Sequence, residues 1–216
     1  MIKIELTEVV GWNAAIRGMR NPMNSWDKSD SKEGVIGEND LKLMKNLSKA
    51  GKDHAKFRRM IIVYADITAP LYWWKEYDTY KVGTVANSCS TMHKIGSKAF
   101  TKEDFSLDHV GVTFTDEDGD EVFLNYWTDG VVPHILDGLN TARWRWLHET
   151  DPAIKKQFWW NMIQLLPSSY NQKRTIMLSY EVLANIYKSR KNHKLDEWHA
   201  FCDWIESLPY AEGIIF

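Results

Sequence analysis

The chain has 216 residues, with 27 Lys and Arg against 29 Asp and Glu and a formal net charge of −2. This length supports a sizeable core, and we predict a single domain over residues 1–216. Because there is no basic excess, nucleic acid is not expected as a partner. No run of about 18 apolar residues and no signal peptide is present, so we expect a cytoplasmic protein that does not enter a membrane.

The cysteines and histidines give no metal signature. Cys89 and Cys202 are the only cysteines, which excludes a cysteine-rich zinc site and does not indicate a disulfide scaffold. The seven histidines are dispersed, and the closest two, His193 and His199, are six residues apart and would not share a helix face. We therefore expect no metal site.

The first part of the chain predicts strands and helices in alternation. Residues 2–10 alternate apolar and polar side chains, which indicates a strand with one buried face. Residues 12–20 predict a short helix, and a polar loop follows it. An amphipathic helix is expected from Glu38 to a stop at Gly51. Residues 60–67 (MIIVYADI) are the strongest candidate for a buried strand.

A helix is expected after this strand, with Pro70 in its first turn, where the missing N–H costs nothing. It would continue to about Tyr80, before Gly83. Lys75 and Asp78 are three residues apart on it, so they form either a solvated ion pair or part of a catalytic group.

From Gly83 to Thr91 the side chains are small and polar, which predicts a loop. Its hydroxyls and amide are either ordinary turn residues or a cradle for the ribose, base or phosphate of a nucleotide, with Lys81 beside it. Cys89, near His93, is either a small packed side chain or a nucleophile activated by histidine.

The second half predicts a hairpin and four helices. Residues 110–127 indicate the hairpin, with Asp118-Gly119 at its turn. The acids there form a solvated turn or a calcium site, although the later ligands of a calcium loop are missing. The other expected elements are helices over 130–148 and 152–166, a short strand over 175–178, a helix capped by Ser179 that runs to Arg190, and a helix over 194–208.

Arg190 has two interpretations. A cation at the end of a helix complements the helix dipole, and an arginine also matches a phosphate with two parallel hydrogen bonds. Common catalytic motifs do not decide the question, because the chain has no Walker loop, no G-x-G-x-x-G, no H-E-x-x-H and no G-x-S-x-G.

This layout resembles the flavin-dependent thymidylate synthases, the ThyX family, whose signature is R-H-R-x-x-S-x-N-E-x-S-x-R. His54 and Phe57 precede the buried strand and Ala69-Pro70 follows it, as in the family. Read without a gap, Thr79-Tyr80-Lys81 falls on R-H-R, with Thr84 on the first Ser. A shift of one residue places Asn87 on the family's Asn and Ser90 on its second Ser. In that register Ser88 replaces the Glu and Met92 the last Arg.

The C-terminal half is also similar to the family. Leu166-Pro167 and Arg190 fall at matching spacing, whereas Ser179 and Glu181 replace the Asn and Arg that contact flavin. Each lost charge-assisted hydrogen bond is worth roughly 1.5–3 kcal/mol, so flavin binding should weaken substantially.

The resemblance implies an α+β fold, a mostly antiparallel sheet flanked by helices, in a homotetramer. It implies nucleotide contacts at Lys81, Asn87, Ser88, Ser90 and Arg190, and cofactor contacts at His54, Tyr80 and Ser179. One hypothesis is one-carbon transfer to dUMP with FAD, NADPH and methylenetetrahydrofolate. A second is a nucleotide-binding or sequestering protein, or an enzyme of other chemistry, that has lost flavin. A third is a protein-binding surface formed by the eleven tryptophans.

Overall fold

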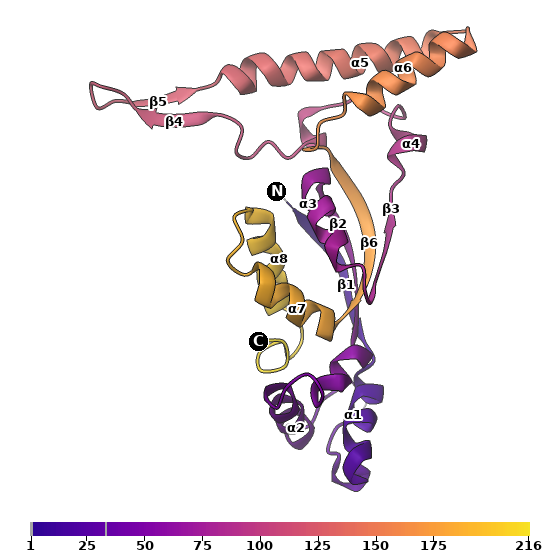
Figure 1. Ribbon diagram of the computed structural model, residues 1–216, viewed down its shortest axis with the longest axis vertical. Coiled ribbons are helices and arrows are strands. Elements are labelled where there is room, and N and C mark those ends of the chain that lie inside the picture. Colours follow the sequence, from indigo (N-terminus) through magenta and orange to yellow (C-terminus); the bar gives the residue numbers. More distant parts are fainter. Residues whose placement is uncertain (1, 33) are drawn as a thin grey trace. The chain divides into compact units, whose positions relative to one another are not determined.

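The computed structural model describes residues 2–32 and 34–216, which form two compact units (Figure 1). Unit 1 comprises residues 69–74 and 88–173. Unit 2 comprises residues 75–87, 174–216 and the described residues up to Thr68. The single domain over residues 1–216 stays a prediction. No helix of the described residues is both long and apolar enough to cross a membrane.

The predicted α+β class is confirmed, since an antiparallel sheet is accompanied by helices. In chain order, the strands and α-helices are β1 (Lys3–Val10), α1 (Trp12–Arg20), α2 (Glu38–Lys49), β2 (Ile62–Pro70), α3 (Leu71–Tyr77), β3 (Thr84–Ser88), α4 (Thr91–Lys94), β4 (Val112–Thr115), β5 (Glu121–Leu124), α5 (Val132–His148), α6 (Pro152–Gln164), β6 (Asn171–Ser179), α7 (Tyr180–Arg190) and α8 (Asp196–Glu206). Short 3-10 segments include η3 (Ala55–Met60) and η4 (Asp78–Tyr80), and a π-helical turn, η6, spans Tyr126–Val131.

The main sheet has the strand order β1-β2-β6-β3. Strands β1 and β2 are antiparallel, with Lys3 opposite Thr68 and Val10 opposite Ile62. Alternate residues of β2, namely Val63, Ala65 and Ile67, are at most 1% exposed. The buried face expected from the sequence is therefore present, and it contributes to the core of unit 2.

The polar run after Gly83 corrects one expectation. Thr84–Ser88 form the edge strand β3 rather than a loop. Four of the five residues of β3 are exposed, so no buried face imposes alternation on this sequence. The strand could therefore not be predicted from an alternation of apolar and polar side chains.

The entry to α3 corrects two further expectations. Pro70 is the last residue of β2, and α3 begins one residue later, at Leu71. A proline has no N–H to donate, so the end of a strand accepts it as readily as a first helical turn. Asp78 pairs with Arg174, at 2.9 Å between Oδ1 and Nη1, rather than with Lys75.

The core of unit 2 joins the sheet to its C-terminal helices. Leu183 and Ile186 of α7, and Trp198 and Phe201 of α8, are fully buried. Ser179 caps α7 as expected, because its Oγ accepts from the backbone N–H of Val182. The two C-terminal helices follow the predicted spans closely.

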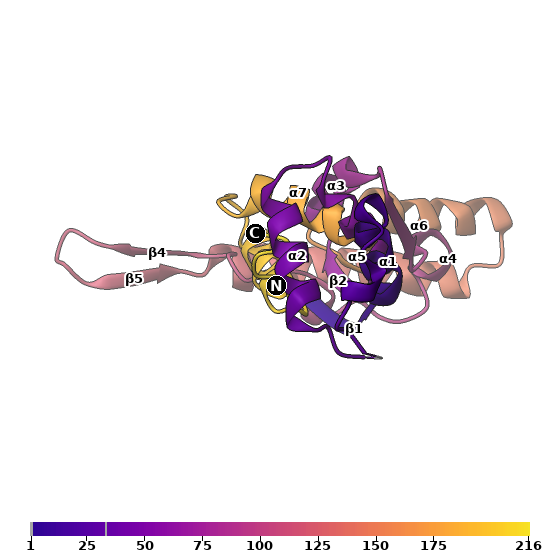
Figure 2. The same cartoon turned by 90° about the horizontal axis from the view of Figure 1, so that it is seen from below.

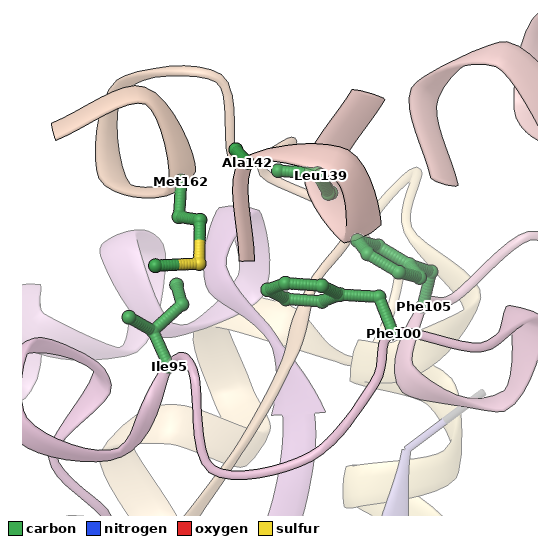
Figure 3. Packing of buried hydrophobic residues seen from close by; sticks show 6 residues of the cluster. All are labelled: Ile95, Phe100, Phe105, Leu139, Ala142 and Met162. Atoms are coloured by element: carbon green, nitrogen blue, oxygen red, sulfur yellow. The ribbon is translucent and has the colours of Figure 1, made fainter. Parts of the chain in front are cut away.

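Unit 1 has a separate core between α5 and α6 (Figure 3). Its members are Ile95, Phe100, Phe105, Leu139, Ala142 and Met162, each at most 7% exposed. The predicted hairpin is confirmed as β4 and β5, with Val112 opposite Leu124. Figures 1 and 2 show β4 and β5 side by side as an arm that no helix of unit 1 covers.

Candidate functional site

A cleft of about 270 Å³ in unit 1 gathers cations and hydroxyls. We call it the lysine cleft, after Lys94, Lys98 and Lys173 in its wall. Its other lining residues are Cys89, Ser90, Thr91, Ile95, Ser97, Ala99, Phe100, Asp104, Tyr170, Asn171 and Gln172. A cleft with this mixture suits an anionic, hydroxyl-rich ligand.

Two hydrogen bonds hold the two walls of the lysine cleft together. The amide of Cys89 donates to the carbonyl of Lys173 at 2.9 Å, and the Gln172 side chain donates to the carbonyl of Cys89 at 2.9 Å. Ser90 then begins α4, where its Oγ accepts from the amide of His93 at 3.2 Å. These contacts position residues 89–91, the end of the polar run, along the cleft.

The electrostatics of the lysine cleft are set by its lysines. Lys98 pairs with Asp104, and this carboxylate raises the pKa of Lys98. Burial and, after it, the charge of Asp104 raise the pKa of Tyr170, so its phenol is neutral at pH 7. Within the described residues, the Lys94 ammonium makes neither a hydrogen bond nor an ion pair. Lys94 is therefore available to an anionic ligand.

A second polar group lies in unit 2 around Arg190. Its guanidinium donates from Nη1 to Glu76 Oε2 and from Nε to Tyr80 Oη, both at 2.8 Å, and lies 4.7 Å from the ring centroid of Trp198. Glu76 Oε2 also accepts from Trp198 Nε1 at 3.0 Å and lies 3.3 Å from His193 Nε2. We call these five residues the Arg190 cluster.

Arg190 can still be either a cation that complements the helix dipole or a phosphate ligand. Its charge, however, is already paired with Glu76. Arg190 ends α7, where a cation is favourable, and its side chain is 17% exposed. The carboxylate of Glu76 neutralises the guanidinium and takes one of its two outer nitrogens. A phosphate there would have to compete with an ion pair that is already formed.

The remaining predicted nucleotide contacts lie along one stretch of chain. Lys81 follows η4 and Asn87 is in β3, both in unit 2, whereas Ser88 and Ser90 belong to unit 1. The side chains of Lys81, Asn87 and Ser88 are exposed. Among these predicted contacts, the described lysine cleft includes only Ser90 in its wall.

The predicted cofactor contacts do not fit a flavin dinucleotide. Ser179 is 7% exposed and its Oγ already caps α7. The Tyr80 hydroxyl is engaged by Arg190. His54 is exposed. None of the three is an arginine or a lysine, the residue types that meet phosphate with a permanent charge.

Glu181, at the start of α7, also fits a flavin phosphate poorly because it is an acid. It stands where the resemblance places a flavin-contacting arginine, and its Oε2 lies 3.9 Å from Nη1 of Arg58. Burial lowers the pKa of Arg58, while the charge of Glu181 opposes this effect. Arg58 Nε and Glu181 Oε2 are buried without hydrogen-bond partners, which indicates a strained, mutually neutralising pair. Glu181 therefore offsets the charge of Arg58 at the start of α7.

The other chemical hypotheses find little support. Cys89 is exposed, and its thiol makes no hydrogen bond to His93 among the described residues. Cys202 is buried, and this burial raises the pKa of its thiol to about 11. Among the described residues, no three His, Cys, Asp or Glu side chains are placed to hold a metal ion.

Sequence reasoning missed most of the lysine cleft. Lys94 and Lys98 are four residues apart, but α4 ends at Lys94, so the spacing alone did not predict a shared site. Lys173 and Tyr170 lie more than 70 residues further along the chain, and only tertiary folding brings them to the same cleft. In the Arg190 cluster, Glu76, His193 and Trp198 were likewise not connected by any local pattern.

No protein-family model matches this chain, and no curated protein matches it. Solved structures do match. ThyX from Helicobacter pylori with FAD and dUMP has a TM-score of 0.66 at 13% identity, covering 100% of this chain and 97% of that one. A second ThyX structure from Helicobacter pylori, complexed with FAD and dUMP, has a TM-score of 0.65 at 15% identity and covers 99% and 97%.

A third structure extends this comparison beyond ThyX itself. The UMP/dUMP methylase PolB from Streptomyces cacaoi, bound with 5-Br dUMP, has a TM-score of 0.65 at 13% identity, covering 99% of this chain and 94% of that one. Identities this low show the fold alone. The resemblance to ThyX is therefore confirmed at the level of the fold.

Proposed function

We propose that this chain binds one pyrimidine mononucleotide in the lysine cleft and acts without flavin. The observation that carries the proposal is the grouping of Lys94, Lys98 and Lys173 around one cleft. The similar solved structures contain dUMP or its 5-bromo derivative, which supports a nucleotide as the ligand of this fold.

The phosphate is held by the lysines. A charge-assisted hydrogen bond contributes roughly 1.5–3 kcal/mol, and ammonium groups are common phosphate ligands. Lys98 shares its charge with Asp104, so Lys94 supplies the strongest attraction. We assign Lys94 the main phosphate contact and Lys98 a secondary one.

The sugar and base are oriented by neutral groups. Asn171 Oδ1 is occupied by the hydroxyl of Ser106 at 2.9 Å, which leaves the Asn171 amide N–H groups to donate to a carbonyl of the base. The Ser90 hydroxyl accepts from an amide and can still donate its own proton to the sugar. The neutral phenol of Tyr170 completes the wall.

The size of the lysine cleft favours a single nucleotide. Ligand pockets commonly have volumes of about 300–1,000 Å³, and this cleft, at about 270 Å³, is slightly smaller than that range. A flavin dinucleotide needs considerably more room. Size and charge thus agree with the poor fit of His54, Tyr80 and Ser179 to flavin.

The alternative is flavin-dependent one-carbon transfer to dUMP, with NADPH and methylenetetrahydrofolate. The fold match to ThyX complexes that contain FAD and dUMP favours it. In this hypothesis Lys81, Asn87, Ser88 and Arg190 contact the nucleotide, as predicted. A homo-oligomer, tetrameric by the resemblance, belongs to both hypotheses.

Calorimetric titration tests the lysine cleft. We expect dUMP to bind and 2′-deoxyuridine, which lacks the phosphate, to bind at least tenfold more weakly. Lys94→Gln should weaken dUMP binding about tenfold, the loss of one charge-assisted contact. Lys156→Gln, an exposed lysine of α6 outside the cleft, should change it less than about twofold.

Two outcomes would contradict this proposal. Equal dUMP affinity in Lys94→Gln and the unmodified protein removes the lysine cleft as the phosphate site. A larger loss in Arg190→Gln than in Lys94→Gln moves the phosphate to the Arg190 cluster and supports the residues predicted from the sequence.

The visible absorbance spectrum tests the absence of flavin. We expect colourless protein that shows no bound flavin after incubation with FAD and gel filtration. A yellow protein that converts dUMP with NADPH and methylenetetrahydrofolate would establish the alternative.

A further inference from the structure

A further cavity, within unit 2, has a volume of about 700 Å³. Three segments form its wall: the end of β1 with the first turns of α1, the described part of residues 32–36, and Pro209 with Tyr210. We call it the Trp12 pocket. Its volume is within the range of about 300–1,000 Å³ that is common for small-molecule sites. Its described residues are distinct from those of the lysine cleft and the Arg190 cluster.

Two aromatic rings form much of the apolar wall of this pocket. Trp12 and Tyr210 meet edge to face, with their ring centroids 5.5 Å apart. The fully buried Tyr180 holds both in place. Its ring lies edge to face with Trp12 at 5.3 Å, and its hydroxyl donates to the carbonyl of Pro209 at 2.7 Å. Tyr210 nevertheless stays 38% exposed, so a ligand ring finds a preformed aromatic surface.

The polar part of the Trp12 pocket is positively charged. Arg17 and Lys32 line it, and none of its described lining residues is an Asp or a Glu. Glu33 lies outside the described residues. Within the part of the chain that the structure describes, neither the Arg17 guanidinium nor the Lys32 ammonium makes a hydrogen bond or an ion pair. These two charges are therefore available to a ligand, unlike that of Arg190, which is already in an ion pair.

The start of α1 adds to the attraction for an anion. Gly11 is the N-cap of this helix, and it lines the pocket together with Trp12 and Asn13 of the first turn. No side chain caps this end of α1, and its first turn contains no acid. The N–H groups of a first helical turn favour a negative charge. The helix end and the two cations thus act in the same direction, beside an aromatic wall.

We propose that the Trp12 pocket binds an aromatic anion, that is, a planar ring joined to a phosphate or a carboxylate. Arg17 and Lys32 hold the anionic group, and an arginine matches either group with two parallel hydrogen bonds. The ring packs against Tyr210 and Trp12. A ligand with only one of these two parts would leave either the cations or the aromatic wall without a partner. This site is separate from the lysine cleft, so the proposal does not rest on the proposed function.

Calorimetric titration of the full chain tests the pocket with four probes. AMP carries a ring and a phosphate, and indole-3-acetate carries a ring and a carboxylate. Adenosine has the ring without the anion, and inorganic phosphate has the anion without the ring. We expect at least one of the two complete probes to bind, at least tenfold more tightly than adenosine or inorganic phosphate. Binding of AMP alone identifies the anionic group as a phosphate, and binding of indole-3-acetate alone identifies it as a carboxylate.

Three variants locate the bound probe. Arg17→Gln should weaken its binding about tenfold, the loss of one charge-assisted contact. Arg59→Gln, which changes an exposed arginine of η3 outside the pocket, is the control and should alter binding less than about twofold. Tyr210→Gly removes the ring at a residue with φ of 56°, a conformation that glycine adopts freely, so the backbone is not strained by the change. It should also weaken binding about tenfold.

Three results would overturn the proposal. The first is that neither complete probe binds with a dissociation constant below about 1 mM. The second is equal affinity for the probe in Arg17→Gln and Arg59→Gln. The third is probe binding that is lost in Lys94→Gln but not in Arg17→Gln, because the probe then lies in the lysine cleft.

The two sites are measured separately in the same variants. Titration of dUMP into Arg17→Gln reports on the lysine cleft, whereas titration of AMP or indole-3-acetate into Lys94→Gln reports on the Trp12 pocket. Loss of one signal with retention of the other shows which of the two proposals fails.

Discussion

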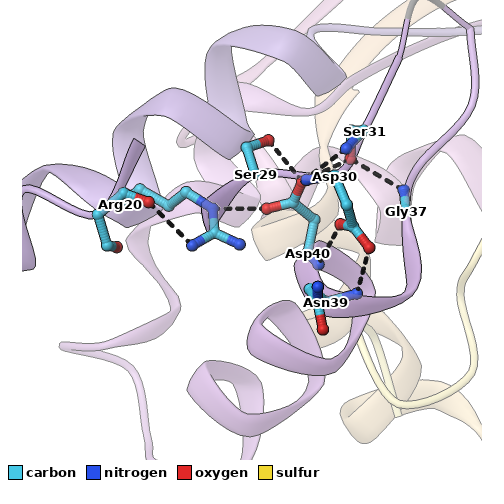
Figure 4. Close-up of polar contacts among 8 residues, drawn as sticks. Arg20, Ser29, Asp30, Ser31, Gly37, Asn39 and Asp40 are labelled. Carbon is cyan, nitrogen blue, oxygen red and sulfur yellow. Dashed lines mark hydrogen bonds and ion pairs between the residues drawn. The ribbon is translucent and has the colours of Figure 1, made fainter. Parts of the chain in front are cut away.

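Arg20 Nε lies 2.6 Å from Asp40 Oδ1, and both side chains are almost completely buried, at 5% and 0% exposed (Figure 4). The pair joins the end of α1 to the first turn of α2. Asp40 Oδ2 accepts from the hydroxyls of Ser29 and Ser31, each at 2.7 Å, and Arg20 Nη1 donates to the carbonyl of Ser25. Because the pair is hydrogen-bonded on both sides, it fixes the polar loop between the two helices.

Removing Asp40 should destabilise unit 2 strongly. Asp40→Ala leaves the Arg20 charge buried without its partner, which costs about 3–5 kcal/mol and lowers the melting temperature by roughly 10 °C. Calorimetry or urea unfolding measures the loss. Glu5→Ala, which breaks the exposed pair with Lys3, is the control and should cost less than about 1 kcal/mol. Similar losses in the two variants would contradict the importance of burial.

The same carboxylate should make stability depend on pH. Burial raises the pKa of Asp40, but the hydrogen bonds from Ser29, Ser31 and Arg20 outweigh it and hold the pKa at about 2, against an ordinary value of 3.8. A depressed pKa in the folded state contributes stability above pH 4 that is lost as the pH falls from about 4 to about 2.

The shift corresponds to about 2 kcal/mol. Urea unfolding at pH 5, 4 and 3 measures it. Asp40→Asn should unfold with a flatter dependence on pH than the unmodified protein over this range. Equal slopes would show that other carboxylates control acid unfolding.

Glu76 should stabilise the Arg190 cluster more than an ordinary surface acid does. Its Oε2 is the acceptor for Arg190 and Trp198, so Glu76→Ala leaves two donors unsatisfied, at a cost of about 1–3 kcal/mol. Asp196→Ala, which removes an exposed contact to His199, is the control and should change stability by less than about 0.5 kcal/mol. Thermal unfolding compares the two; equal effects would mean that the cluster contributes no more than its exposed counterpart.

Replacing Gly11 should cost more than its positive φ angle alone explains, because an added Cβ would also clash with a neighbouring segment. Gly11 has φ of 96°, and a Cβ there would lie 2.0 Å from the carbonyl oxygen of Met60. Gly51 has φ of 107° but open space around it. Gly51→Ala therefore tests backbone strain alone, about 1–2 kcal/mol. Gly11→Ala adds a backbone clash.

We expect Gly11→Ala to lose at least twice as much unfolding free energy as Gly51→Ala, because the clashing atom belongs to the backbone and not to the end of a flexible side chain. Urea unfolding of the two variants makes the comparison. A smaller loss in Gly11→Ala would mean that the contact between α1 and η3 relaxes easily.

Local sequence features predicted the elements whose signals lie close together in the chain. The short helix expected over residues 12–20, the cap at Ser179 and the Asp118-Gly119 turn each correspond to an element of the structure. The edge strand β3 was missed because an exposed strand needs no alternation. The position of Pro70 was missed by one residue, because a strand end and a helix start tolerate proline equally.

The sequence by itself determined most of the elements, because hydrophobic periodicity, caps and turns lie within a few residues of one another. The α+β class came from the resemblance to ThyX, which depends on short motifs such as Ala69-Pro70 and Leu166-Pro167. Only the tertiary structure decided which charges meet. It brought Lys173 to Lys94, bound Arg190 to Glu76, and set Arg58 against Glu181. Whether a cation is free or neutralised depends on partners about 80 to 120 residues away in the sequence. A pattern of neighbouring residues cannot predict contacts over such separations.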